Sequence, residues 1–291
     1  MLNGETAELS YRTSGFGPSR VNWNATGLYL INEAKLILGT GLKPGQKIMG
    51  WREKSIRSNG LSKARGILEA AYLFNQGYPS KEAYFLEHLA DHLKEKGMIS
   101  SSINRDLMSD FRDGKTIPFL NELMGHNFLE QVLVPWHELD SKIVEEVLRP
   151  SNLYGRVMYD ALGGIDGEKE VNIISAAHIS GGGIPEKVKR MLEVKKLGAH
   201  IEPVFEDPKA VSMLMELAEK HLPEEQSKKM IDQRRACEQW NRGLGFVAVV
   251  ENNEDADRLT VIGSKYGVEI AQVGEILPDP KIEWRGHTWT Y

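Results

Sequence analysis

A run of three glycines between an apolar stretch and a helix-forming stretch is the feature that most restricts how this chain can fold. Residues 171–177 (VNIISAA) suit a buried strand, and they lead directly into the segment HISGGGIPE at 178–186. Pro185 is expected at the first position of the following helix, where a missing N–H is tolerated. The pattern therefore predicts a strand, a tight glycine turn and a helix in succession.

Helices and strands alternate along the rest of the chain, which indicates an α/β or α+β fold with a mixed sheet covered by helices. A turn signal at Lys43-Pro44-Gly45 precedes the first strand. Strands are expected at 47–51, 171–177, 200–204, 245–250 and 268–276, with the alternating tail 282–291 as a final strand. Helices are expected after a cap at Ser62, from Ser80 to Gly97, and over 139–148, 153–163, 207–221, 223–240 and 254–266.

The composition is that of an ordinary globular protein. Among 291 residues, 36 Lys and Arg oppose 41 Asp and Glu, so the formal net charge is 36 − 41 = −5. This balance argues against a basic nucleic-acid binder and against a disordered chain. The sequence has no apolar stretch of membrane-spanning length and no signal peptide at its first residues, so a cytoplasmic protein that does not contact membranes is expected. The lone Cys237 is interpreted as an apolar filler rather than a nucleophile.

The glycine run can bind phosphate. Backbone N–H groups of Ser180, Gly181, Gly182 and Gly183 can point into one concavity, and the start of the next helix adds partial positive charge. His178 and Arg190 flank the run and could add charged contacts. The alternative is a tight turn with no ligand. The run is not a Walker A loop, because it lacks the Gly-Lys-Ser/Thr ending.

Three further segments are weaker candidates when each is taken alone. The turn SNGLS at 58–62 could bind an anion at a helix start, or could simply cap that helix. Glu5 and Glu8 could hold Mg²⁺ or act as acid and base, or could be solvated. In WNRGLGF at 240–246, Asn241 could orient a substrate group, although a glycine pair there is typical of a helix C-cap. His88 and His92 have metal-ligand spacing but no evident third ligand.

Taken in order, these segments resemble the aminoimidazole ribonucleotide synthetase family (phosphoribosylformylglycinamidine cyclo-ligases). The family pattern includes GGETAEMP, a Ser-Ser-Gly-x-His-Ser-Asn-Gly stretch, HITGGG and FNxGxG. The matching segments here are NGETAEL (3–9), SNGLSKAR (58–65), PSNLY (150–154), HISGGGIPEKVKR (178–190) and WNRGLGF (240–246). The glycine triplet with its His and Arg is the most specific of them.

The resemblance implies an ATP-dependent ligase of purine biosynthesis, which closes formylglycinamidine ribonucleotide to aminoimidazole ribonucleotide. ATP and Mg²⁺ are the implied cofactors, and a homodimer or pairing with a separate N-terminal half is the implied assembly. It assigns catalysis to His178, Asn59 and Arg190. It assigns the substrate or its phosphate to Ser58, Gly60, Ser180, Gly181, Gly182, Gly183 and Asn241. It assigns the nucleotide to Glu5, Thr6 and Glu8, and the metal to Glu5 and Glu8.

The chain also departs from the family. The upstream half domain with its Asp-Gly-Val-Gly-Thr-Lys motif has no counterpart in this sequence, Arg57 stands at the family's His, and Asn24 stands at a family Asp. Residues 1–44 are therefore interpreted as the remnant of an N-terminal ATP-binding domain, and 45–291 as a C-terminal synthetase-type α/β domain with a helical insertion at about 75–143. A catalytically impaired paralogue that binds a nucleotide or a partner chain is the main alternative. A kinase-like member of the superfamily is a further one.

Overall fold

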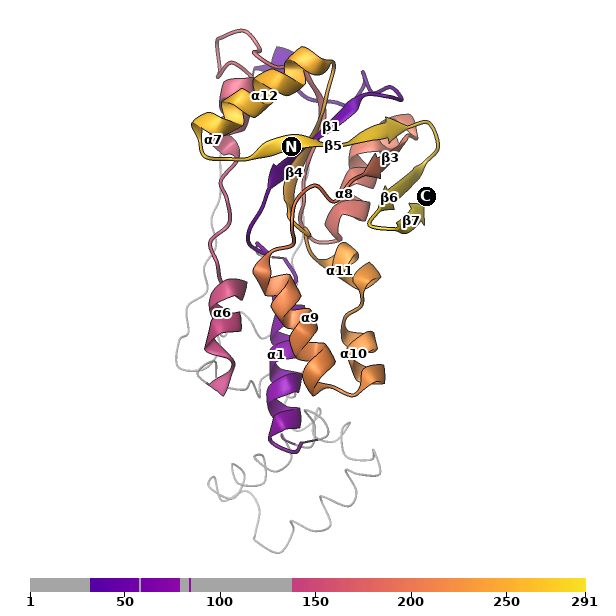
Figure 1. Cartoon of the computed structure of the whole chain (residues 1–291). Helices are drawn as coiled ribbons and strands as arrows, with labels where there is room; N and C mark the ends of the chain where they lie inside the picture. Colours follow the sequence, from indigo (N-terminus) through magenta and orange to yellow (C-terminus); the bar gives the residue numbers. More distant parts are fainter. Residues whose placement is uncertain (1–31, 58, 79–83, 85–137) are drawn as a thin grey trace, which may run out of the picture. The chain divides into compact units, whose positions relative to one another are not determined.

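The computed structural model describes residues 32–57, 59–78, 84 and 138–291 (Figure 1). The chain divides into two compact units, one made of Met1–Leu28 with Tyr72–Glu138 and the other of Tyr29–Ala71 with Leu139–Tyr291. Apart from Tyr84, the helix predicted between Ser80 and Gly97 lies outside the described residues, as do His88 and His92. The division into an N-terminal remnant, a C-terminal domain and an insertion stays a prediction.

A mixed sheet of seven strands lies at the centre of the second unit, in the order β2-β4-β1-β5-β3-β6-β7. Among these pairs β3 and β6 are parallel, and the other neighbours are antiparallel. The strands are β1 (Lys47–Arg52), β2 (Ile173–His178), β3 (Gly198–Ile201), β4 (Leu244–Val250), β5 (Ile270–Leu277), β6 (Lys281–Trp284) and β7 (His287–Thr290). The predicted mixed sheet covered by helices is confirmed.

Each face of the sheet is buried under its own helices, because alternate side chains of the central strands point to opposite sides. Val247 and Val249 of β4 belong to one core with helices α8 and α11, whereas Ala248 and Val250 belong to a second core with α7 and α12. The helices are α1 (Leu61–Asn75), α6 (Ser141–Val147), α7 (Gly155–Ala161), α8 (Gly183–Leu192), α9 (Lys209–His221), α10 (Glu224–Met230), α11 (Gln233–Gln239) and α12 (Asn253–Lys265). Short 3₁₀ turns lie at Glu33–Lys35 and Glu193–Lys195.

Two predicted elements are each divided in the structure. The helix expected over 223–240 is two helices, because Ile231 is extended and the Asp232 side chain accepts a hydrogen bond from the backbone N–H of Arg235 to begin α11. The final strand expected over 282–291 is a hairpin, because Arg285 and Gly286 both have positive φ, at 48° and 76°. Such a two-residue turn matches the twist of antiparallel strands.

Other boundaries differ by a few residues. The strand expected at 200–204 is Gly198–Ile201, and α1 begins at Leu61, so Ser62 lies inside its first turn. Helix α8 begins at Gly183 with Gly182 as its N-cap, which places Pro185 at the third helical position instead of the first. Proline is accommodated there because the first turn of a helix leaves its N–H groups without helical partners.

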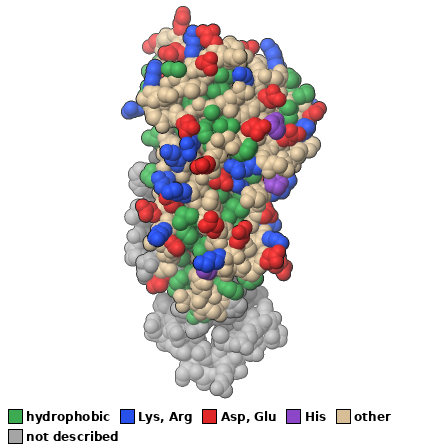
Figure 2. Space-filling model, in the orientation of Figure 1, with side chains coloured by type: hydrophobic (Ala, Val, Ile, Leu, Met, Phe, Trp, Pro, Cys, Tyr) green, Lys and Arg blue, Asp and Glu red, His purple; other side chains and the backbone are tan. Residues whose placement is uncertain are grey.

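Residues 32–44 pack against the sheet-containing unit. The Gly39 backbone N–H donates to the Ile174 carbonyl at 3.0 Å, and the Lys35 ammonium donates to the Gly164 carbonyl at 2.8 Å. Within the described residues, no helix is long and apolar enough to cross a membrane. Acidic and basic side chains are interspersed over the face seen in Figure 2, in keeping with the modest net charge.

The His200 imidazole predicts a pH dependence of stability. Its Nε2 lies 2.9 Å from a Glu202 oxygen and its Nδ1 lies 3.1 Å from a Glu283 oxygen, and these two contacts raise its pKa above 6.5. A raised folded-state pKa means that the stabilisation is complete below the unfolded pKa and is lost as pH rises through the folded pKa. The melting temperature of the wild type minus that of H200N is therefore expected to fall from pH 6 towards pH 8. A constant difference over that range would contradict the assignment.

Candidate functional site

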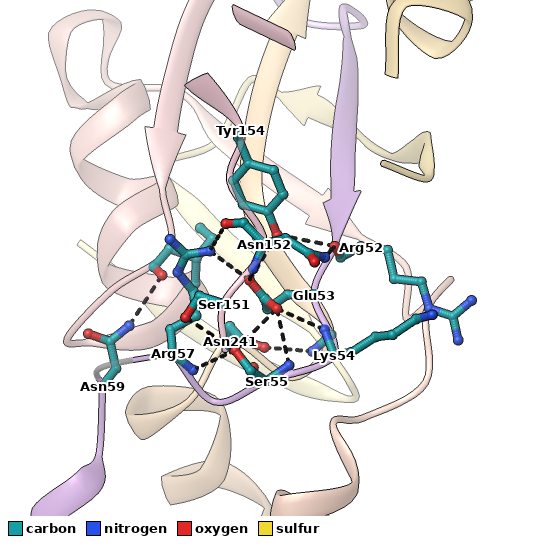
Figure 3. Close-up of polar contacts among 12 residues, drawn as sticks. Arg52, Glu53, Lys54, Ser55, Arg57, Asn59, Ser151, Asn152, Tyr154 and Asn241 are labelled. Carbon is teal, nitrogen blue, oxygen red and sulfur yellow. Dashed lines mark hydrogen bonds and ion pairs between the residues drawn. The ribbon is translucent and has the colours of Figure 1, made fainter. Parts of the chain in front are cut away.

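The sheet order brings the sequence motifs to one edge. Strands β1, β4 and β2 are antiparallel neighbours, so the end of β1, the end of β2 and the start of β4 lie together. Arg52 pairs with Leu244, and His178 pairs with Phe246. The segment after β1, the glycine run after β2 and the WNRGLGF segment before β4 therefore meet (Figure 3).

The carboxylate of Glu53 is the buried centre of this edge. Its side chain is 0% exposed. Oε1 accepts hydrogen bonds from the backbone N–H groups of Lys54 and Ser55, at 2.9 and 3.1 Å, and from the Ser55 hydroxyl at 3.2 Å. The local chain thus folds around the carboxylate in a tight turn, which explains how a buried anion is tolerated here.

The second oxygen of Glu53 joins the turn to another part of the chain. Oε2 accepts from the Arg57 guanidinium at 2.6 Å, from the Tyr154 hydroxyl at 3.0 Å and from the Asn152 backbone N–H at 3.3 Å (Figure 3). Burial, followed by the charge of Glu53, raises the pKa of Tyr154, so the phenol stays protonated and donates. This carboxylate therefore ties the turn after β1 to the PSNLY segment.

Arg57 is held in a single orientation by several partners. Besides the ion pair with Glu53, its Nη1 donates to the Asn152 carbonyl at 3.2 Å, and its guanidinium lies 5.2 Å from the centre of the Tyr154 ring. Its backbone has φ of 59°, a left-handed value that is uncommon for residues other than glycine. The guanidinium keeps 14% of its side-chain surface open, so a positive charge is presented at the edge.

Two asparagines connect the remaining motifs. The Asn241 side chain donates to the Ser55 carbonyl at 2.8 Å and accepts from the Gly243 backbone N–H at 3.0 Å. The Asn59 side chain donates to the Ile179 carbonyl at 3.4 Å, which joins the Asn-Gly turn to the start of the glycine run (Figure 3). Asn241 thus acts as a structural link, and Gly243 does not cap α11, which ends at Gln239 with Trp240 as its C-cap.

The glycine run is required for the packing of α8. Gly182 and Gly183 have φ of 91° and 62°, and a Cβ on Gly183 would lie 2.0 Å from the carbonyl oxygen of Cys237 in α11. Gly181 is exposed, and a Cβ there would meet nothing within 4 Å. The run therefore combines a close helix–helix contact, at Gly183, with an open backbone position at Gly181.

His178 is a neutral imidazole in a positive environment. The side chain is exposed at the end of β2, but desolvation by the surrounding chain, then the charges of Arg57 and Lys187, lower its pKa below 6.5, and the charge of Glu53 opposes them. At neutral pH the ring is therefore uncharged and can accept a proton. The same two cations make this edge attractive to a phosphate.

The other predicted residues lie in different elements of the structure. Gly60 directly precedes α1 and lies beside Trp240, and Ser180 lies in the loop before α8. Arg190 is on the exposed side of α8, where it binds Glu186 at 2.5 Å. Cys237 is buried, and burial raises the pKa of its thiol, as expected for a filler. Four predicted site residues lie outside the described part of the chain: Glu5, Thr6, Glu8 and Ser58. The residues that the structure does describe contain no cluster of three metal-ligating side chains.

The sequence pattern missed the residues that organise this edge. Glu53-Lys54-Ser55 stands where the family pattern has Ser-Ser-Gly, and the sequence pattern predicts no site role for Glu53, Tyr154 or Lys187. The available signal was the replacement itself: Glu53 and Arg57 stand four residues apart and carry opposite charges. Their spacing permits an ion pair, but the partner Tyr154 comes from 101 residues away.

Comparisons with known proteins agree on one family. The model described as "AIR synthase related protein, C-terminal domain" matches residues 141–286, which is half of the chain. A phosphoribosylformylglycinamidine cyclo-ligase of Methanococcus maripaludis strain C7 is 25% identical over 293 residues, covering 99% of this chain and 58% of the relative. One from Carboxydothermus hydrogenoformans is 24% identical over 277 residues, covering 95% of this chain and 58% of the relative.

Solved structures are similar only at a low level. Among them is T. maritima PurL complexed with FGAR, which is 14% identical with a TM-score of 0.34 and covers 88% of this chain and 28% of that one. A second is T. maritima PurL complexed with ATP, at 12% identity and a TM-score of 0.35, with 89% and 26% covered. The chain spans less than two thirds of the length of the curated relatives named above.

Proposed function

The chain belongs to the AIR synthase related proteins through its C-terminal domain, and from this premise we propose that it takes part in the ATP-dependent cyclisation of formylglycinamidine ribonucleotide to aminoimidazole ribonucleotide. Curated relatives that carry the name phosphoribosylformylglycinamidine cyclo-ligase support the proposal. We further propose that an N-terminal half supplied by a separate polypeptide completes the enzyme. The relatives are longer than the region they share with this chain, which is the reason for that proposal.

The convergence of the motifs at one sheet edge is the observation that carries this proposal. Asn59 contacts the glycine run, Asn241 contacts the turn after β1, and the neutral His178 lies near two cations. A phosphorylated substrate requires positive charge and backbone N–H groups at one place, and the proposal is supported by the charges of Arg57 and Lys187 near His178 and by the open backbone position at Gly181.

The roles of this chain's residues follow from their charges. Arg57 and Lys187 would hold the substrate phosphate, with Gly181 allowing the backbone to approach it. His178, uncharged at neutral pH, would accept the proton that the attacking nitrogen loses on ring closure. ATP, when bound, supplies the phosphoryl group that activates the amide oxygen. We assign its binding to Glu5, Thr6 and Glu8, and Mg²⁺ to the carboxylates of Glu5 and Glu8.

Release of ADP tests the proposal. The natural chain is purified alone and together with the product of an adjacent reading frame that encodes Asp-Gly-x-Gly-Thr-Lys. ADP is then measured with formylglycinamidine ribonucleotide and ATP. We expect substrate-dependent ADP release from the combined sample. Absence of ADP from both samples, with folded protein, would remove the cyclo-ligase proposal.

His178→Asn is the variant with the clearest expected effect on that activity. Loss of a general base lowers kcat by about 10²-fold or more, and the acidic limb of the pH–rate profile should disappear with it. His200→Asn is the matched control, because His200 lies on β3 and pairs with Glu202 and Glu283 instead. Equal activity of the two variants would show that His178 is not the base.

A catalytically impaired paralogue that binds nucleotide or a partner chain remains the second candidate. One observation favours it: the Arg57 guanidinium, at the family's histidine position, is committed to the buried Glu53 carboxylate at 2.6 Å. This candidate predicts that the purified chain binds ATP or the ribonucleotide in calorimetry while releasing no ADP with any partner. Release of ADP in the combined sample would exclude it.

A further inference from the structure

A cavity lies on the loop that leads into α9. It has a volume of about 650 Å³ and is lined by loop residues 203–207, by Lys209, Ser212 and Met213 of α9, and by Arg285 from the turn between β6 and β7. A volume of this order suits a small organic ligand. None of the residues that line this cavity belongs to a sequence motif.

The charges around the cavity do not balance. Arg242, whose side chain is 2% exposed, binds both oxygens of Asp207, with Nε at 2.9 Å from Oδ1 and Nη2 at 2.6 Å from Oδ2. Arg285 then shares the same carboxylate, with its Nη2 at 2.9 Å from Oδ1. Two guanidinium groups therefore rely on one carboxylate, which leaves one positive charge in excess.

The other polar groups do not remove that excess. Arg242 also donates to the carbonyl and side-chain oxygens of Gln233, which are neutral, and Arg285 donates to the Phe205 carbonyl at 3.5 Å. Within the part of the chain that the structure describes, the Nε of Arg285 is buried and has no hydrogen-bond partner. Glu206 also lines the cavity, but its side chain is 92% exposed to solvent and lies 4.0 Å from Arg52.

Apart from Ser212, the rest of the lining is cationic or apolar. Lys209 adds a second positive side chain at the start of α9, whose N-cap Pro208 gives that helix no side-chain cap. Val204 and Met213 supply apolar surface, and Val204 is 49% exposed. The Arg285 side chain is 22% exposed, so its charge is only partly solvated, and an anion that pairs with it would be favoured.

We propose that this cavity binds a small phosphate monoester, with its phosphate on Arg285 and Lys209 and its organic part against Val204 and Met213. A guanidinium can donate two hydrogen bonds at once to a phosphate, and it is only weakly hydrated in water. The residues that line the cavity lie outside the sequence motifs, and the proposal does not depend on the cyclisation activity. Asn241 contacts Ser55 of that edge, while the next residue, Arg242, holds the Asp207 carboxylate of the cavity.

Titration with phenyl phosphate and with inorganic phosphate tests this site in the full chain. The readout is the NMR signal of the ¹³C-labelled Met213 methyl group, assigned with M213L, because Met213 lines this cavity. We expect phenyl phosphate to shift that signal with a Kd about tenfold lower than that of inorganic phosphate. No shift with either probe, or equal affinities for both, would overturn the phosphate-ester assignment.

Arg285→Asn is the variant of choice, because asparagine accepts the left-handed backbone of this turn. It should raise the Kd for phenyl phosphate about tenfold or more, and Lys209→Met should act in the same direction. Lys229→Met removes an exposed cation of α10 and should leave the Kd unchanged. If R285N binds phenyl phosphate as tightly as the wild type and the K229M control do, the excess charge at Arg285 does not hold the ligand.

Discussion

Glu53→Ala is expected to destabilise the sheet-containing unit by about 3–5 kcal/mol, the range for removing one partner of a buried ion pair. The carboxylate is 0% exposed, so its removal takes the ion-pair partner from the Arg57 guanidinium and the acceptor from two turn N–H groups. The Tyr154 hydroxyl keeps the Arg52 carbonyl, at 3.1 Å, as an acceptor. Urea unfolding followed by tryptophan fluorescence measures the effect, since the buried Trp51 is two residues away.

Glu254→Ala is the matched control for that measurement. Glu254 and Arg258 form another pair four residues apart, at 2.7 Å, but their side chains are 74% and 55% exposed. An exposed pair of this kind contributes about 0.3–0.5 kcal/mol. Similar effects of the two substitutions would mean that Glu53 is not the buried centre of the edge.

A double-mutant cycle separates the ion pair from the other contacts of Glu53. If Arg57→Ala alone is destabilising and Glu53→Ala adds little to it, the pair accounts for most of the effect. If the effects of the two substitutions add, the hydrogen bonds from Tyr154 and the turn N–H groups are the larger part. Both outcomes keep Glu53 as the organising residue, and only the weak effect described above would remove that role.

Gly183→Ala is expected to destabilise the same unit by about 3 kcal/mol or more. The added Cβ would lie 2.0 Å from the carbonyl oxygen of Cys237, a backbone atom that cannot move away without shifting α11. The φ of 62° adds strain for any residue with a side chain. The unfolding free energy in urea is the measurement.

Gly181→Ala is the matched comparison within the same run. Because a Cβ on Gly181 meets no described atom within 4 Å, the free energy of unfolding of G181A should stay within about 0.5 kcal/mol of the wild-type value. If Gly181 lets the backbone approach a phosphate, as proposed, this folded variant should nevertheless lose substrate binding. Unchanged substrate affinity in G181A would assign the glycine run to packing alone.

Much of the architecture could be predicted from local pattern. The strand–glycine–helix unit, the predominance of alternating helices and strands, and the burial of Cys237 all depend on residues close together in the chain. The errors fell where a single residue changes the local geometry. Asp232 begins a new helix inside a continuous helical pattern, and Arg285-Gly286 reverses a tail that alternates like one strand. The spacing of apolar residues along the chain does not reveal such turns.

The candidate site could be predicted only in outline. The motifs themselves were visible, since each is a contiguous run. Asn59 and Asn241 lie at one edge (Figure 3), where His178 ends β2 and pairs with Phe246 of β4. Their neighbours were not visible, because Tyr154 reaches Glu53 from 101 residues away and Lys187 affects His178 only through space.

By itself, the sequence determined that this chain builds a layered α/β domain with a glycine turn after an apolar strand, because those properties follow from side-chain spacing along the chain. Only the tertiary structure decided that Glu53 and Arg57 form the buried centre of the motif edge. It also decided that Arg242 and Arg285 share the Asp207 carboxylate beside a cavity. Which charged side chains face one another in the interior depends on which strands are neighbours in the sheet. A local sequence pattern carries no information about those neighbours.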